Sequence, residues 1–311
     1  MKTGQTRQDS EGIYFARELE LLKPQAYQRA YPEMKFATAI PTSADKDPGA
    51  QTITYEMYDL VGIAKIISNY ADDLPRADIR GRQFSVQVQT LATSAGWNYG
   101  ELQAGIKTGK PINSRKLDAA QQVLMRLVDK LAFLGDTETG LVGLTTIPNM
   151  PNTVVATVSG ATTWAAKLAL GTDAGKQAVL DDLNIAFTRM QTATKGIEVP
   201  DTLALSPTSY AQISQTPRTA QSDTTLLDFF LKAHPGVEVI VIPWLETSGT
   251  GATRQMLLYR RDPMKLELEI PEDLVIHNQQ ERGLEWVVPL SMRFGGVVCR
   301  FPLSLDSSYG M

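Results

Sequence analysis

Cysteine and histidine are scarce in this sequence, and their scarcity excludes several kinds of chemistry. Among 311 residues there is one cysteine, Cys299, and there are two histidines, His234 and His277. A single cysteine cannot form an intrachain disulfide, and neither histidine lies at a metal-ligand spacing from Cys299. Cys299 lies within an apolar run and is interpreted as a small core residue. His234 precedes Pro235 at a predicted helix end, where a protonated imidazole suits the helix dipole.

Long apolar runs and a strong net charge are also missing. No run approaches the roughly 20 residues that a membrane-spanning helix needs, and the polar N-terminus has no signal-peptide core. The formal net charge is −4, so no basic field attracts nucleic acid. The hydrophobic fraction of 43% and the charged fraction of 21% are ordinary for a globular protein. We expect a cytoplasmic chain with one large domain or two modest ones. If the protein contacts DNA, we expect it to do so as part of the wall of a container that holds the DNA.

No constellation for catalysis or ligand binding is recognisable. The sequence has no G-x-S-x-G hydrolase motif. GDTETG (135–140) lacks the Lys-Ser/Thr of a phosphate loop, and SGTGATR (248–254) lacks the third glycine of a dinucleotide loop. Asp72 and Asp73 form an isolated acidic pair, which is typical of a solvated loop. We therefore assign no catalytic, cofactor-binding or metal-binding residue, expect no cofactor, and predict that the protein is not an enzyme.

Residues 42–90 predict a two-stranded ribbon. In TITYEMY (52–58) and FSVQVQ (84–89), apolar and polar side chains alternate, as they do in strands with one buried face. The intervening stretch is rich in Asp, Arg, Pro and Gly. There the densest basic group, Arg76, Arg80 and Arg82, lies among acidic residues, which favours salt bridges to a partner over phosphate binding. The apolar sides of the two runs consist of Ile53, Tyr55, Met57, Phe84, Val86 and Val88.

The strongest helix prediction is NSRKLDAAQQVLMRLVDKLAFLG (113–135), a spine that should cross a sheet. Asn113 or Ser114 can cap its start, and Gly135 ends it. A shorter helix is expected to begin at Ser94, within SAGWNYGELQAGIKTG (94–109). The apolar stripe of the long helix recurs at steps of three and four: Leu117, Ala120, Leu124, Leu127, Leu131 and Leu134.

The remaining chain mixes strands and helices, which favours an α+β or α/β organisation. Helices are expected near 175–191 and 223–233, and another is opened by Ser206 and Pro207. The N-terminal 40 residues, with the amphipathic piece GIYFARELELL (12–22), indicate an arm. Expected strands are DTLAL (201–205), VEVIVIPWL (237–245), QMLLYR (255–260), MKLELEI (264–270), LEWVVPLSMRF (284–294) and GVVCRFPLSL (296–305), with a tight connection at 295–296.

The ribbon and the arm have apolar sides but no core of their own. A two-stranded ribbon alone is marginally stable in water. The simplest explanation is that another copy of the protein covers these sides. A loop that reaches outward to a neighbour makes a head-to-tail contact, and such contacts close into rings or extend into shells and filaments.

The order of these parts resembles the major capsid protein of tailed double-stranded DNA bacteriophages, whose fold is shared with encapsulin nanocompartments. An arm is followed by a loop whose outer segment reads NYADDLPRADI (69–79), and then by the two helical stretches. GLVGLTTIPN (140–149) leads into the central part, and RFGGVVCRFPLSL (293–305) lies in the terminal sheet. Some relatives crosslink a loop lysine to a distant asparagine. Lys65 lies in this loop, but no motif identifies its partners, so that chemistry is not carried over.

The resemblance implies an α+β tailed-phage capsid fold. Its segments would be an N-terminal arm (1–41), an extended loop (42–93), a peripheral domain with the spine helix (94–140), an axial domain (141–260), and peripheral strands with the C-terminus (261–311). It also implies pentamers and hexamers that tile an icosahedral shell around a double-stranded DNA genome.

The implied partners are first of all copies of the same chain, reached through the extended loop and the arm. A portal, scaffolding or decoration proteins, and packaged DNA contacted without sequence specificity are further expected partners, and a membrane is not. The implied location is the virion, after assembly in the host cytoplasm. The alternative is an encapsulin-type shell that holds an enzyme cargo, and a third class, a monomeric α+β enzyme, lacks a convergent acid, base or nucleophile.

Overall fold

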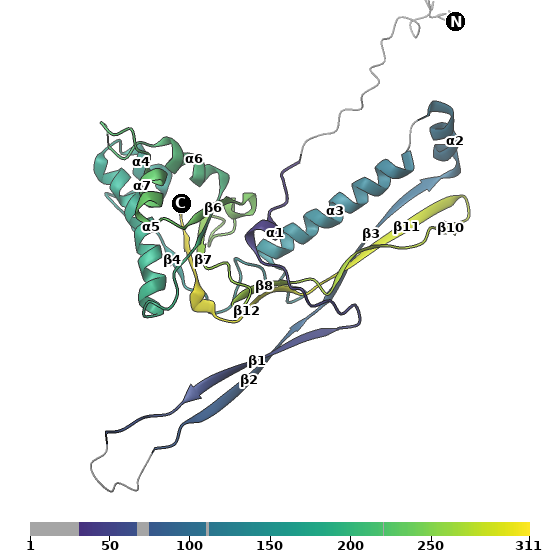
Figure 1. Ribbon diagram of the computed structural model, residues 1–311. Helices are drawn as coiled ribbons and strands as arrows, with labels where there is room; N and C mark the ends of the chain where they lie inside the picture. Colours follow the sequence, from purple (N-terminus) through teal and green to yellow (C-terminus); the bar gives the residue numbers. More distant parts are fainter. Residues whose placement is uncertain (1–30, 67–74, 110–111, 220) are drawn as a thin grey trace, which may run out of the picture. The chain divides into compact units, whose positions relative to one another are not determined.

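The computed structural model of this chain describes residues 31–66, 75–109, 112–219 and 221–311. The chain divides into a unit of residues 1–33 and a unit of residues 34–311. All the helices and strands described below belong to the second unit, which is of the α+β type (Figure 1). The predicted amphipathic piece of the arm, 12–22, lies outside the described residues.

The predicted ribbon is an antiparallel hairpin of β1 (Thr52–Val61) and β2 (Asp78–Gln87). After Val88 the chain continues as β3 (Gln89–Asn98), which pairs along its whole length with β11 (Glu285–Phe294). β9 (Glu272–Ile276) and β10 (Gln280–Arg282), which the sequence did not predict, pair with β11 as well. The ribbon prediction is confirmed, and both strands are longer than predicted.

The helix expected from Ser94 begins later, at α2 (Tyr99–Thr108). Asn98 caps it: its side chain accepts a hydrogen bond from the Glu101 N–H, and the Glu101 carboxylate accepts one from the Asn98 N–H. The prediction is wrong for residues 94–98 because they pair with β11, with Trp97 opposite Trp286. Small residues such as Ser94 and Gly96 specify neither a helix nor a strand locally, so the pairing with β11 decides their conformation.

The predicted spine is confirmed as α3 (Ile112–Leu134), which ends at Gly135 with a left-handed φ of 65°. It begins at Ile112, so Asn113 and Ser114 lie in its first turn and are not its N-cap. Its buried stripe also differs from the prediction: Leu127 is exposed and Val128 is fully buried. The buried apolar positions are Ala120, Leu124, Val128, Leu131, Ala132 and Phe133.

A second, five-stranded sheet has the order β4-β13-β7-β5-β6. Its strands are β4 (Asn152–Val154), β13 (Leu305–Tyr309), β7 (Gln255–Tyr259), β5 (Thr202–Leu205) and β6 (Glu238–Val241). The accompanying helices are α4 (Trp164–Ala169), α5 (Asp173–Ala193), α6 (Pro207–Gln215) and α7 (Leu226–Ala233). α6 is opened by Ser206 and Pro207 as predicted. The predicted strand 237–245 is a strand only as far as Val241, because Pro243 starts a 3-10 turn, Pro243–Glu246.

This sheet separates two hydrophobic cores. Alternate residues of β5 point to opposite faces, so Leu203 and Leu205 join the core beneath α4–α7 while Ala204 joins the core that contains Leu124 and Val128 of α3. A third cluster lies between α3 and the β3–β11 sheet, around Trp97. The spine therefore contributes to the packing of both sheets.

A buried ion pair lies within the helical layer. The Lys167 ammonium is 2.5 Å from the Asp182 carboxylate, and the Trp164 indole N–H donates to the same carboxylate at 2.9 Å. Lys167 is fully buried and Asp182 nearly so. The indole and the ammonium together compensate a charge that would be costly to bury alone.

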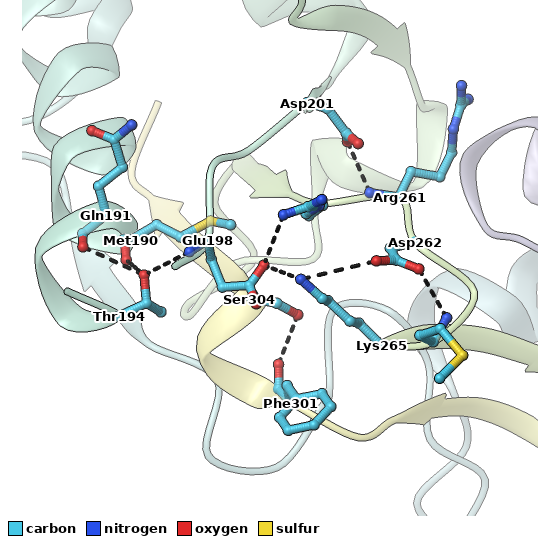
Figure 2. Close-up of polar contacts among 12 residues, drawn as sticks. Met190, Gln191, Thr194, Glu198, Asp201, Arg261, Asp262, Lys265, Phe301 and Ser304 are labelled. Carbon is cyan, nitrogen blue, oxygen red and sulfur yellow. Dashed lines mark hydrogen bonds and ion pairs between the residues drawn. The ribbon is translucent and has the colours of Figure 1, made fainter. Parts of the chain in front are cut away.

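Glu198 lies where three connecting segments of the chain meet (Figure 2). β8 (Leu266–Glu269) pairs with β12 (Gly296–Cys299), and the chain passes from β7 to β8 and from β12 to β13 at this point. The Glu198 carboxylate, on the connection from α5 to β5, accepts a hydrogen bond from Lys265 and lies 3.6 Å from Arg260. The Arg260 N–H also donates to the Ser304 carbonyl at 3.2 Å. These contacts link the helix-covered sheet to the β8–β12 pair.

Candidate assembly surface

The base of the β1–β2 hairpin is fixed to the rest of the residue 34–311 unit. The preceding segment runs beside β8, where the Ser43 N–H donates to the Leu268 carbonyl at 2.9 Å. Lys46 donates to the Ile270 carbonyl and pairs with Asp273, both at 3.0 Å. The two strands of the hairpin are joined at its base by the Val88 N–H, which donates to the Gln51 carbonyl at 2.9 Å. These bonds hold the base on the edge of the body.

The apolar side of the base is partly covered by the chain itself, although Phe84 on this side stays exposed. Ile53, Tyr55 and Met57 are half-buried, whereas the residues between them are exposed. A cleft of about 470 Å³ separates Thr52–Tyr55 from Glu269 and Arg300 on the body. The Tyr55 ring stacks on Phe84 at 5.4 Å, and burial raises the pKa of its hydroxyl. The expectation that only another copy shields this side is therefore wrong at the base, because β8 and β12 lie beside it.

The outer half of the hairpin carries apolar side chains that the described chain leaves exposed. Tyr58 is 69% exposed, Leu60 83% and Ile79 60%. Ile63 and Ile66, beyond the last strand pair, are exposed too. Exposed apolar surface that is gathered on a projecting element marks an interaction site. We call the strand segments 58–61 and 78–81 together the outer hairpin.

The sequence holds a signal for this surface that was not used. Met57 and Tyr58 are two consecutive apolar residues, so the alternation changes phase at this point. Apolar positions before it lie on one face of the hairpin, and Tyr58 and Leu60 lie on the other. The prediction followed the first phase only and so did not identify Tyr58 and Leu60 as exposed apolar side chains.

The predicted basic group lies on the exposed part of the hairpin. Arg76, Arg80 and Arg82 are all exposed, while Asp72 and Asp73 fall outside the described residues. Asp59 stands opposite Arg80 in the strand register. Salt bridging of these arginines to a partner stays a prediction.

The residues considered for chemistry lie in packing positions. The His234 ring stacks on Phe187 at 3.9 Å, its Nε2 lies 3.3 Å from the Asn184 amide oxygen, and burial lowers its pKa. Cys299 packs against the core around α3, and burial raises the pKa of its thiol to about 12. A neutral thiol of this kind is a poor nucleophile. His277 hydrogen-bonds to the Ser291 hydroxyl at 2.7 Å on the exposed side of the β9–β11 pair.

Comparisons with known proteins agree with a structural role. The model of the major capsid protein family matches residues 62–306. The capsid protein of the Myoviridae phage XM1 is similar in structure, with a TM-score of 0.81, 18% identity, and coverage of 97% of this chain and 100% of that one. The mature capsid of bacteriophage PhiM1 has a TM-score of 0.62 at 12% identity, covering 94% and 91%.

The virus-like particle of Pyrococcus furiosus has a TM-score of 0.57 at 13% identity, covering 88% of this chain and 91% of that one. A comparison with curated proteins found no match. In the part of the chain that the structure describes, no helix has the length and apolar content to cross a membrane.

The α+β body with its spine helix and projecting hairpin defines a structural subunit that associates with copies of itself. The family match covers most of the chain, and the solved capsids share its fold. The chain belongs to the major capsid protein family. It is a structural, non-enzymatic component of a virion shell.

Proposed function

We propose that the chain assembles into pentamers and hexamers of an icosahedral shell that encloses a double-stranded DNA genome. The observation that carries this proposal is the outer hairpin, whose Tyr58, Leu60 and Ile79 project from the body without cover from the described chain. In a shell of identical subunits, a neighbouring copy contacts this projecting element, whichever of its faces is used. A hairpin that reaches in one direction makes a head-to-tail contact, and such contacts close into rings.

The energetics favour this arrangement. Burial of apolar surface contributes roughly 25 cal/mol per Å², so each buried Leu or Ile of the hairpin contributes on the order of 2 kcal/mol. Many identical contacts per shell add to a large total, although each subunit gains little. Weak repeated contacts also allow subunits that join incorrectly to leave again, because a single contact is readily broken.

The remaining assignments extend the same proposal. Residues 1–41 serve as an arm, 42–93 as the extended loop, 94–140 and 261–311 as the peripheral domain, and 141–260 as the axial domain around the capsomer centre. β3 runs across the boundary at 93–94, so loop and peripheral domain share one continuous strand. We further propose a portal and scaffolding or decoration proteins as partners, non-specific contact with the packaged DNA, and assembly in the host cytoplasm.

The proposal is tested by shortening the hairpin. Met57 and Arg82 are the paired residues directly before the outer hairpin, so residues 58–81 can be replaced by Asn-Gly, a two-residue turn that suits an antiparallel hairpin. We expect a soluble variant with an unchanged unfolding midpoint that forms no closed particles in electron micrographs. Efficient formation of closed particles by this variant would contradict the role of the hairpin.

An encapsulin-type compartment is the second candidate, because the Pyrococcus particle has the same fold. Its subunits would also form shells, so assembly does not distinguish the two functions. The content of the particles does. Nuclease-protected double-stranded DNA in purified particles supports the genome shell, whereas a co-purifying enzyme in their place supports the compartment.

A further inference from the structure

The two faces of the hairpin exchange their chemical character between base and tip. At the base, the face that carries Ile53, Tyr55 and Phe84 is apolar, and the opposite face carries Thr54 and Ser85. The register from Thr52–Gln87 to Val61–Asp78 is continuous, so side chains keep alternating between the faces. Beyond Met57, the face that was polar becomes apolar.

The outer hairpin therefore has an apolar face and a charged face. Tyr58, Leu60 and Ile79 lie on the face that is polar at the base. The other face carries the pairs Asp59–Arg80 and Val61–Asp78, and Arg82 lies on the same face just before this segment. The Tyr58 ring covers Gly81 opposite it, where an added Cβ would be 3.2 Å from the ring. An aromatic ring over a cross-strand glycine extends the apolar surface across both strands.

The charged face has less need of a partner. Asp59 is directly opposite Arg80, and opposite charges at such positions attract each other across an antiparallel pair. Exposed charges are also well solvated, and burying them without a partner is unfavourable. The apolar face has no such compensation, and it lies opposite the face that the body contacts at the base.

We propose that the outer hairpin binds a neighbouring copy of this chain through the Tyr58–Leu60–Ile79 face, and that the Arg80–Arg82 face stays accessible to solvent. The inference rests on the proposed shell, because membership of the capsid family makes a second copy of this chain the partner that covers the apolar face. The hairpin thus uses one face for its own body and the opposite face for the neighbour. The change of phase at Met57–Tyr58 permits both contacts from one ribbon of continuous register.

Adjacent residues of β2 allow a direct test. Ile79→Cys and Arg80→Cys place thiols one residue apart on opposite faces. Each variant is assembled into particles and treated with a maleimide reagent. Wild-type Cys299 gives a low background because it is largely buried and its thiol pKa is raised to about 12. We expect labelling in intact particles to be about ten-fold slower at position 79 than at position 80, and similar at both positions in dissociated subunits.

A second pair on β1, Leu60→Cys and Asp59→Cys, repeats the comparison on the other strand. If cysteine at 60 and 79 prevents assembly while cysteine at 59 and 80 does not, the apolar face is again the contact. Equal labelling of the two faces in particles, or slower labelling at 59 and 80, overturns the inference and leaves the shell proposal intact. A wild-type chain that forms no particles overturns both.

Discussion

At the scale of single residues, Glu269 is the most informative side chain near the hairpin. It is only 5% exposed and borders the cleft beneath Ile53 and Tyr55. Burial raises the pKa of its carboxyl, and the nearby negative charges of Glu267 and Asp45 raise it further, against the opposing effects of Ser43 and Arg300. An ionised carboxylate is therefore less favourable here than in water.

The pH dependence of stability follows from the direction of this shift. Below about pH 4.5, the ordinary pKa of a glutamate, the carboxyl is protonated in both the folded and the unfolded chain. As the pH rises through the folded-state pKa, the unfolded chain ionises more readily, and the folded state loses stability relative to it. Glu269 thus destabilises the fold at neutral pH and has no such effect in acid.

We expect Glu269→Gln to raise the free energy of unfolding at pH 7, with the gain shrinking toward pH 4. The amide keeps the acceptor for Ser43 and removes the charge. Urea unfolding curves at several pH values measure the difference. Glu281→Gln, on an exposed strand, serves as the control and should leave stability unchanged at each pH. A gain for Glu269→Gln that persists unchanged at pH 4 would refute this explanation.

At the scale of elements, two helix ends show the same backbone conformation in different surroundings. Gly109 ends α2 and Gly135 ends α3, both with a φ of 65°. A Cβ on Gly109 meets nothing within 4 Å, whereas one on Gly135 would lie 2.5 Å from the Leu141 carbonyl oxygen and 2.6 Å from the Gly143 nitrogen. The spine thus ends where the following turn folds back against it.

This difference predicts unequal costs for the same substitution. Gly109→Ala should lower the free energy of unfolding by about 1 kcal/mol, the cost of a left-handed alanine. Gly135→Ala adds a steric clash with backbone and should cost about 3–4 kcal/mol. Chemical unfolding of the two variants tests the comparison, and equal losses would show that the turn after α3 can move aside.

Elements with strong local patterns were predictable from the sequence. The spine helix was predictable because its apolar spacing persists over many turns and a glycine ends it. The strands of the ribbon were predictable because apolar and polar side chains alternate regularly along them. Residues 94–98 were not, since small residues there carry no strand signal and only pairing with the distant β11 decides their conformation. The exposed Leu127 shows a similar limit: its neighbour Val128 is buried because of packing that the helical repeat alone does not specify.

At the scale of the whole molecule, the shell should depend on apolar contacts more than on charge. The net charge is small, and several exposed apolar residues lie together on the outer hairpin. In 1 M salt the screening length falls to about 3 Å, which weakens exposed ion pairs and leaves apolar burial intact. We expect assembled particles to remain intact in 1 M sodium chloride, as measured by sedimentation. Dissociation into subunits at high salt would show that charged contacts dominate.

One prediction about the whole molecule was wrong: the base of the hairpin is partly covered by its own chain and not by another copy alone. The sequence shows that an apolar side exists, but not that β8 and β12, which lie far from the hairpin along the chain, lie beside its base. Contacts of such separation leave no local pattern. The family resemblance predicted the shell, and the strand register showed which face of the outer hairpin is apolar.

The anchored base and the uncovered outer part of the hairpin together have a consequence for geometry. The segment before β1 is bonded to β8, Ile270 and Asp273, so the root of the hairpin keeps its direction, whereas the outer strands pair with each other. A closed surface of many subunits needs some neighbours to meet at a sharper angle than others. Two-stranded ribbons twist more strongly than larger sheets, so a change of twist along the outer strands lets a single type of subunit accommodate both flat and curved surroundings.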